Sequence, residues 1–193
     1  MNKKAPRLSN TVRIIGGKWR GKKLSFPSIA GLRPTPDRIR ETVFNWLQFE
    51  LQGARVLDLF AGSGVFGLEA LSRGAAYAVF VEKDHKAVTQ LNMHLHELHI
   101  DNATVTHCDA VEYLKTGQEL PFDVVFVDPP YGQQLLSPCL AELENRHFLA
   151  NHAYIYIEAE SSMKSLPLPK NWLLHRSKHS GQVSYHLAQR TSK

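Results

Sequence analysis

The sequence predicts an α/β fold built on a mainly parallel sheet with helices on both faces. Between residues 55 and 158, short apolar runs alternate with segments whose apolar residues recur at helical spacing. Parallel strands need crossover connections, which helices supply. A second observation is the run at 56–59, which breaks at glycines and resumes as a helix, as in a nucleotide-binding βα unit. After residue 169 the alternation stops, which predicts an antiparallel end to the sheet.

The first 50 residues are expected to form a small β-hairpin and a helix. Gly16 and Gly17 provide the turn of a hairpin that continues to residue 24. Two prolines then impose an extended path, after which Asp37 or Thr35 caps a helix over residues 38–47. The buried stripe of this helix is Ile39, Val43, Phe44, Trp46 and Leu47.

The remaining elements follow in order. Strands are expected at residues 55–60, 77–82, 103–107, 122–127 and 153–158. Helices are expected at residues 65–73, 85–98, 110–116 and 133–144. Residues 172–176 and 183–187 flank a turn at Gly181 with no helix between them, so they form an antiparallel hairpin. The complete sheet therefore has seven strands.

Composition indicates one globular domain with at most a small appendage, because the 193 residues are 43% hydrophobic. No apolar stretch approaches the length of a bilayer span, and the N-terminus lacks the apolar segment of a signal peptide. Cys108 and Cys139 are far apart and have neither metal nor redox spacing. We therefore expect a soluble cytoplasmic protein that does not associate with membranes.

Charge divides the chain into residues 1–50, a basic extension, and residues 51–193, a mildly acidic body. The first part has eleven Lys/Arg and three Asp/Glu, a net charge of +8, and the second has a net charge of −3. This asymmetry favours a polyanion bound by the extension, although a solvated tail would have the same composition. Trp19 lies among cations, as in proteins that stack on RNA bases, or else it anchors the hairpin to the core.

The glycine-rich turn fits two kinds of cofactor. Gly62 and Gly64 let the backbone bend close to a ligand, and Gly67 lets the helix pack closely on the sheet. With Glu82 at the spacing of a ribose-binding acid, these glycines also match a dinucleotide fingerprint. Asp58, ahead of the glycines, suits a ligand with an ammonium or sulfonium charge better than a pyrophosphate. This residue favours S-adenosylmethionine over NAD.

Polar residues follow the other strands at the same edge of the sheet, where open α/β sheets bind ligands. Glu82 can accept both hydroxyls of a ribose, Asp109 can accept from an adenine amine, and the Ala110 N–H can donate to the ring. Asp128 begins the run Asp-Pro-Pro-Tyr, whose prolines form a turn without N–H donors. Acceptors at that turn would hold an exocyclic amine and aim its lone pair, while Tyr131 stacks on the base.

These motifs resemble those of class I S-adenosylmethionine-dependent methyltransferases that act on amino nitrogen. The resemblance implies a Rossmann-like fold. Residues 13–21 and 33–47 narrow the resemblance to the RsmD family, bacterial guanine-N2 methyltransferases of 16S ribosomal RNA. The resemblance implies a monomer that acts on 16S RNA, within a small-subunit particle. The implied catalytic residues are Asp128, Pro129, Pro130 and Tyr131. The implied cofactor-binding residues are Asp58, Phe60, Ala61, Gly62, Gly64, Glu82, Lys83, Asp109 and Ala110. The implied RNA-binding residues are Arg13, Lys18, Trp19, Arg20, Lys22, Lys23, Arg33, Arg38 and Arg40.

Other functions remain open from the sequence. The Asp-Pro-Pro-Tyr turn would equally serve an adenine-N6 DNA methyltransferase or a glutamine-N5 protein methyltransferase. An RNA-binding assembly factor could retain the cofactor fold without turnover. A metal site is not expected, because His94 and His96 point to different faces of their helix and only His96 and His99 share one.

Overall fold

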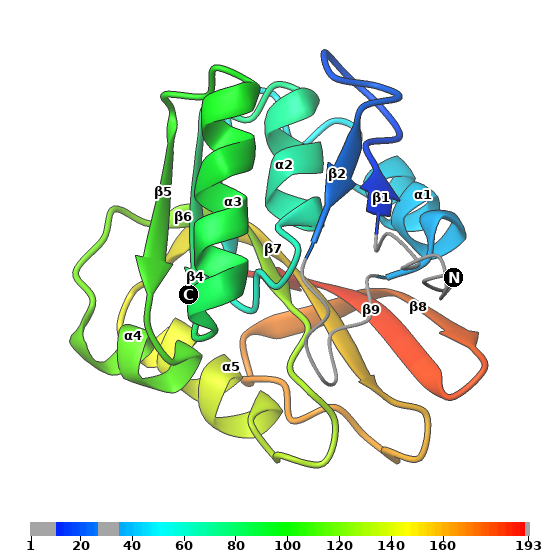
Figure 1. Ribbon diagram of the computed structural model, residues 1–193. Coiled ribbons are helices and arrows are strands. Elements are labelled where there is room, and N and C mark those ends of the chain that lie inside the picture. Colours follow the sequence, from blue (N-terminus) through cyan, green and yellow to red (C-terminus); the bar gives the residue numbers. More distant parts are fainter. Residues whose placement is uncertain (1–10, 27–34, 192–193) are drawn as a thin grey trace, which may run out of the picture.

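The computed structural model describes residues 11–26 and 35–191 of the chain (Figure 1). Its main sheet comprises β3 (Arg55–Asp58), β4 (Tyr77–Glu82), β5 (Ala103–His107), β6 (Phe122–Val127), β7 (Leu149–Glu160), β8 (Trp172–Ser180) and β9 (Val183–Arg190). The helices are α1 (Asp37–Trp46), α2 (Val65–Ser72), α3 (His85–Glu97), α4 (Ala110–Thr116) and α5 (Leu136–Asn145). A separate hairpin pairs β1 (Thr11–Arg13) with β2 (Lys23–Ser25).

The seven strands lie in the order β5-β4-β3-β6-β7-β9-β8. The first five are parallel, and β9 runs antiparallel to both β7 and β8. This confirms the predicted mainly parallel sheet with an antiparallel C-terminal hairpin. All five parallel strands therefore end at one edge, where their carboxyl ends can present side chains to a common ligand.

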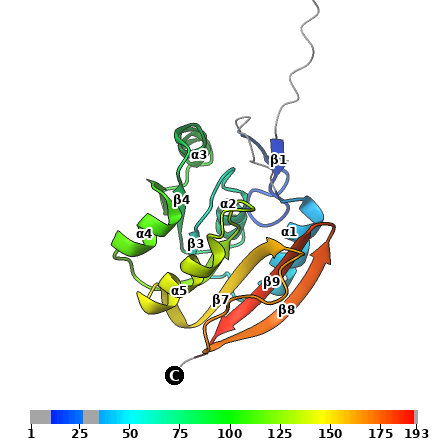
Figure 2. The same ribbon diagram turned by 90° about the horizontal axis from the view of Figure 1, so that it is seen from below.

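Helices cover both faces of the sheet (Figure 2). α1, α2 and α3 lie on one face, and α4 and α5 lie on the other. Each face has its own hydrophobic cluster: Val56, Leu68 and Phe126 belong to the first, and Leu57, Leu114 and Val125 to the second. Neighbouring residues of a strand enter opposite clusters because strand side chains alternate between faces.

The basic extension shares the first of these clusters. Ile14 of the hairpin and Val43 and Phe44 of α1 are fully buried there. At Gly17 (φ +72°) the hairpin approaches the end of α2 so closely that a Cβ would lie 1.8 Å from the carbonyl oxygen of Ser72. The change of charge at residue 50 therefore does not separate two hydrophobic cores.

Several boundaries differ from those expected; among them, β8 and β9 extend beyond residues 176 and 187, to Ser180 and Arg190. α5 begins at Leu136 rather than at 133, because Gly132 and Gln134 have positive φ angles that a helix cannot accommodate. β7 begins earlier, at Leu149, and extends to Glu160. The N-cap of α1 is Pro36, so the prediction that Asp37 or Thr35 caps this helix was wrong. Within the described residues, no helix has the length and apolar character to cross a membrane.

Candidate active site

Carboxyl groups lie at or just beyond the carboxyl ends of all five parallel strands. Four of them, Asp58, Glu82, Asp109 and Asp128, stand at the positions expected from the sequence. The fifth, Glu158 in β7, was not predicted to be a site residue. Asp58 and Glu158 are buried, whereas the other three are partly exposed.

Glu82 is held in place by the backbone of the neighbouring loops. Its Oε2 accepts from the Gly62 N–H at 2.8 Å, and its Oε1 accepts from the Asp84 N–H at 2.7 Å. Each carboxylate oxygen can accept a second hydrogen bond. Glu82 therefore links the glycine turn to the end of β4 and still has acceptor capacity for a ligand.

Asp109 is the N-cap of α4. Its Oδ1 accepts from the N–H groups of Val111 (2.9 Å) and Glu112 (3.3 Å). The second carboxylate oxygen lies outside this cap, and Ala110 begins the helix, where N–H groups have no partner within the helix. The capping role was not predicted, although Asp is a preferred N-cap residue.

The turn between β3 and α2 is compact. Ala61 donates from its N–H to the carbonyl of Val81 at 2.9 Å, and Gly64 donates to the carbonyl of Ala61 at 2.6 Å. Gly64 is the N-cap of α2 with φ +74°, and a Cβ there would lie 2.4 Å from a methyl carbon of Leu91. Phe60 is half-buried against the second cluster, and Lys83 is exposed.

Asp58 joins the end of β3 to α2, because its Oδ2 accepts from the Gly67 N–H at 3.0 Å. Burial raises the pKa of Asp58 to about 7, an effect that this hydrogen bond partly offsets and the nearby Glu82 charge reinforces. A buried carboxylate that titrates near neutral pH is characteristic of functional sites. A cation bound beside Asp58 would lower its pKa, so the carboxyl group would be ionised more fully at neutral pH.

Asp128 and Glu158 form a pair of acids on adjacent strands. Glu158 Oε1 accepts from the hydroxyls of Tyr156 (2.7 Å) and Thr35 (2.9 Å). Although Asp128 as a whole residue is partly exposed, burial of its carboxyl group raises its pKa well above the usual value, and the charges of Glu158 and Asp58 raise it further. Burial also raises the pKa of Glu158, although its two hydroxyl donors oppose the effect. These acids are therefore poised to accept hydrogen bonds or a proton.

The Asp-Pro-Pro-Tyr turn lies at the rim of this acidic site. Pro129 is buried, Pro130 is exposed, and Tyr131 is 49% exposed. The Gly132 N–H donates to Glu160 Oε1 at 2.9 Å, which ties the turn to the end of β7. An aromatic ring is thus displayed beside the Asp128 carboxyl group.

The predicted RNA-binding residues do not form one exposed set. Six of them are exposed: Arg13, Lys18, Arg20, Lys22, Lys23 and Arg38. Trp19 is half-buried against the first cluster, with the Lys18 ammonium 5.2 Å from its ring centroid and its backbone N–H bonded to Ser72 Oγ. Arg33 lies outside the described residues.

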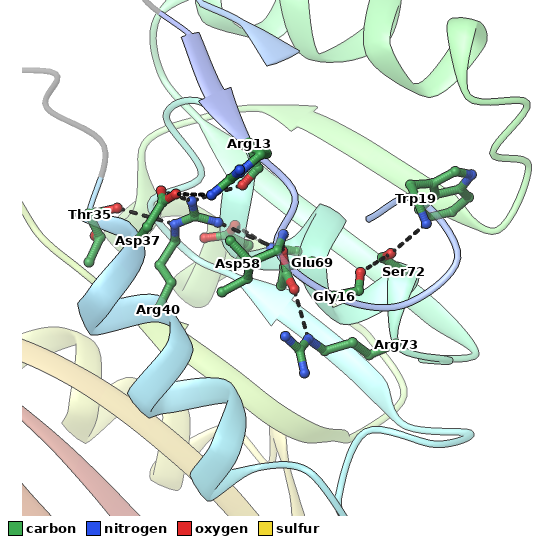
Figure 3. A network of polar contacts seen from close by, with 12 residues as sticks. Arg13, Gly16, Trp19, Thr35, Asp37, Arg40, Asp58, Glu69, Ser72 and Arg73 are labelled. Carbon is green, nitrogen blue, oxygen red and sulfur yellow. Dashed lines mark hydrogen bonds and ion pairs between the residues drawn. The ribbon is translucent and has the colours of Figure 1, made fainter. Parts of the chain in front are cut away.

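Arg40 departs from the expectation, because its side chain is completely buried (Figure 3). Its guanidinium donates to the carbonyl oxygens of Thr35 and Arg13 and to Asp37 Oδ1, and it lies 3.7 Å from Glu69 Oε2. In this arrangement it cannot contact RNA. Arg40 instead joins the hairpin and α1 to the cofactor-side helix α2.

Glu69 is the other residue of this network that sequence reasoning missed. It is fully buried, accepts from the Ile15 N–H at 2.8 Å and pairs with Arg73 Nε at 2.8 Å (Figure 3). A signal was present, since Glu69 is the only charged residue of an otherwise apolar helix. A lone acid in a buried helix calls for a buried cation.

Within the described residues, no group of three or more His, Cys, Asp or Glu is arranged to hold a metal ion. His94 is buried, with its Nε2 2.6 Å from the carbonyl oxygen of Ser25, whereas His96 and His99 are exposed. The histidine-rich helix α3 thus helps to fix the hairpin.

The sheet order, the glycine turn and the acids at the strand ends define a class I methyltransferase. A family model described as "Conserved hypothetical protein 95" matches residues 12–189. The chain belongs to this family, the RsmD family.

Known relatives cover nearly the whole chain. A protein of Escherichia coli K12 named "Ribosomal RNA small subunit methyltransferase D" is 48% identical over 94% of this chain and 91% of its own. A solved structure described as "Putative methyltransferase yhhF from Escherichia coli" has a TM-score of 0.87 at 47% identity, covering 95% of this chain and 99% of that one.

A more distant structure shares the fold alone, with a TM-score of 0.70 at 21% identity, and covers 99% of this chain and 53% of its own. It is described as "T. Thermophilus 16S rRNA N2 G1207 methyltransferase (RsmC) in complex with AdoMet and Guanosine".

Proposed function

We propose that this methyltransferase transfers a methyl group from S-adenosylmethionine to the exocyclic N2 amine of a guanine in 16S ribosomal RNA, acting in the cytoplasm on a small-subunit particle. The observation that carries the proposal is the pairing of Asp128, ahead of its two prolines, with Glu158 on the adjacent strand. The name of the E. coli relative supports the ribosomal RNA substrate.

The residues around the glycine turn fit S-adenosylmethionine. When bound there, this cofactor would supply a methyl group on a positively charged sulfur. Glu82 and Asp109 retain acceptor capacity for the ribose hydroxyls and the adenine amine. The buried Asp58 offers a negative charge at the point where a cation would be stabilised most.

The acids beyond β6 and β7 fit a guanine. The Watson–Crick edge of guanine presents adjacent donors, N1–H and the N2 amine, whereas that of adenine alternates a donor with an acceptor. Asp128 would accept from the N2 amine, orient its lone pair toward the methyl group and receive the proton that the nitrogen loses. Glu158 adds negative potential that favours a donor-rich edge, and the half-exposed Tyr131 can stack on the ring.

The experiment that tests the proposal uses the purified protein, isotopically labelled S-adenosylmethionine and small-subunit particles from a strain that lacks this enzyme. Nucleoside mass spectrometry of the digested RNA should show labelled N2-methylguanosine. Label in N6-methyladenosine would instead indicate that adenine is the methylated base, and label in the protein fraction would indicate a protein substrate.

Replacing Glu82 with alanine should weaken S-adenosylmethionine binding by about 1–3 kcal/mol, because buried ribose hydroxyls lose their acceptor. Isothermal titration calorimetry gives the affinity directly. Glu82→Gln is the matched control, since its amide oxygen still accepts one hydrogen bond, and it should lose less. Unchanged affinity of Glu82→Ala would remove Glu82 from the cofactor site.

The affinity for S-adenosylmethionine should fall as the pH falls below about 7, the pKa of Asp58. A cation favours the ionised carboxylate, so binding below this pH requires Asp58 to release a proton, at a cost of up to about tenfold per pH unit. S-adenosylhomocysteine, which lacks the sulfonium charge, should depend less on pH. Calorimetric titrations from pH 5.5 to 8.5 measure both ligands, and Asp58→Asn should flatten the first profile.

Removing two exposed charges from the hairpin, with Lys22→Ala and Lys23→Ala, should lower RNA affinity and flatten its salt dependence. The slope of log affinity against log salt should change by up to about 1.4, that is about 0.7 for each lost phosphate contact. The matched control is Lys115→Ala with Lys170→Ala, which removes two exposed lysines elsewhere. An unchanged slope would make the hairpin charges a solvated surface.

A further inference from the structure

The acidic residues of the body are confined to its middle part. Residues 51–160 contain six Lys/Arg and fifteen Asp/Glu, a net charge of −9. Residues 161–193 contain six Lys/Arg, three His and neither Asp nor Glu. The chain therefore has a second basic segment, separate from the extension, which the net charge of −3 for residues 51–193 conceals.

This segment includes β8, the edge strand of the sheet. Every residue of β8 after Trp172 is exposed. Arg176 and Lys178 lie in this strand, and neither forms an ion pair with a carboxylate of the described residues. Arg190 on the neighbouring β9 differs, since it pairs with Glu144 at 2.8 Å. Within the described residues, therefore, no carboxylate neutralises the exposed charges of Arg176 and Lys178.

Pairing places these two cations on the same face as the proposed target site. Lys178 lies opposite Tyr185 on β9, and Tyr185 lies opposite Glu158 on β7. Directly opposed residues of antiparallel strands point to one face, so Lys178 shares the face of Glu158. Two strand spacings of about 4.8 Å put their backbones about 10 Å apart.

The tip of the C-terminal hairpin also lies near the Asp-Pro-Pro-Tyr turn at residues 128–131. The Ser161 N–H donates to the carbonyl of Gln182 at 2.9 Å, and the preceding Glu160 holds the Gly132 N–H beside Tyr131. Lys178 therefore lies near the edge at which a flipped-out base would enter. The exposed Leu173 and Leu174 lie at the opposite end of β8.

We propose that Arg176 and Lys178 of β8 form a second RNA-binding surface, which holds the phosphate backbone next to the target base. This proposal rests on the proposed function, since it concerns the same RNA. Two cations without carboxylate partners among the described residues, beside an acidic site, suit a ligand with a phosphate backbone and donor-rich bases. The hairpin and β8 would then contact the RNA at two separate places.

The test compares the full-length protein with a variant carrying Arg176→Ala and Lys178→Ala. Filter binding of protein-free 16S RNA is measured at several salt concentrations, and unfolding curves verify the fold. The variant should bind about tenfold more weakly at 0.15 M salt, with a salt slope reduced by about 1.4. Lys86→Ala with Lys115→Ala, two exposed lysines outside both basic segments, serves as the charge-matched control and should leave both values unchanged.

Two results would overturn this surface. One is an unchanged affinity and slope for the variant on protein-free RNA. The other is a defect seen only on small-subunit particles, which would indicate contact with a ribosomal protein rather than with RNA. Methyl transfer by the wild-type protein is measured in parallel, so that a failure of the proposed function is seen separately as the absence of labelled N2-methylguanosine.

Discussion

Asp128→Ala should lower the rate of methyl transfer by about 100-fold or more while leaving S-adenosylmethionine affinity nearly unchanged. Asp128 follows β6, whereas the cofactor is expected on the side of Glu82 and Asp109. An amine that is held only loosely loses the alignment on which an in-line displacement depends. Single-turnover transfer to small-subunit particles that lack the modification, paired with calorimetry of cofactor binding, measures the two quantities.

Asp128→Asn is the matched control, because its amide oxygen still accepts from the amine, and it should be the milder lesion. The wild-type rate should rise with pH as Asp128, whose pKa burial and Glu158 raise, becomes ionised. The Asp128→Asn rate should lack that rise. Turnover by Asp128→Ala close to that of wild type would mean that the turn is only structural and that the amine is held elsewhere.

Arg40→Ala should reduce the free energy of unfolding by about 3–5 kcal/mol, because it leaves Glu69 as a buried charge without one of its cations. The carbonyl groups of Thr35, in a buried bond, and Arg13, in a part-buried one, lose this donor as well. For a chain of this size the loss corresponds to a decrease in Tm of roughly 6–20 °C. Urea unfolding monitored by circular dichroism measures the free energy.

Arg38→Ala provides the comparison, since Arg38 is two residues away on α1, carries the same charge and is exposed. It should change the free energy of unfolding by no more than about 0.5 kcal/mol. Equal stabilities of the two variants would mean that the buried network contributes nothing beyond surface charge. A larger loss for Arg40→Ala confirms that this arginine supports the fold.

Most of the sheet could be predicted because its signals are local. Runs such as residues 124–127 are apolar throughout, as expected for strands covered on both faces, and each ends near a glycine, a proline or an acid. The beginning of α5 could not be predicted, because Gln134 is not a residue type that signals a positive φ angle, and the loop is held by the bond from Gly132 to Glu160, 28 residues away in sequence.

Site residues could be predicted where they directly follow a strand. They could not be predicted where the role of a residue depends on whether its side chain is buried. Asp58, Glu82, Asp109 and Asp128 stand out because each carboxylate ends an apolar run or a turn. Arg40 has the same sequence features as its exposed neighbour Arg38, and only the position of Glu69 on a distant helix distinguishes them. Glu158 likewise ends the apolar run 155–157, a signal that was available but was not interpreted as part of the site.

The contacts of α1 have a consequence for the order in which the chain is completed. Trp46 stacks on Tyr185 of β9 at 5.6 Å, and Thr35 bonds to Glu158. At synthesis rates of about 5–20 residues per second, roughly 7–30 s pass between the emergence of this helix and that of its last partner strand. α1 is therefore synthesised early, but its contact with β9 forms late. A nascent chain that stops before β9 lacks the ring on which Trp46 stacks, so truncation at the C-terminus should expose this side chain of the first helix.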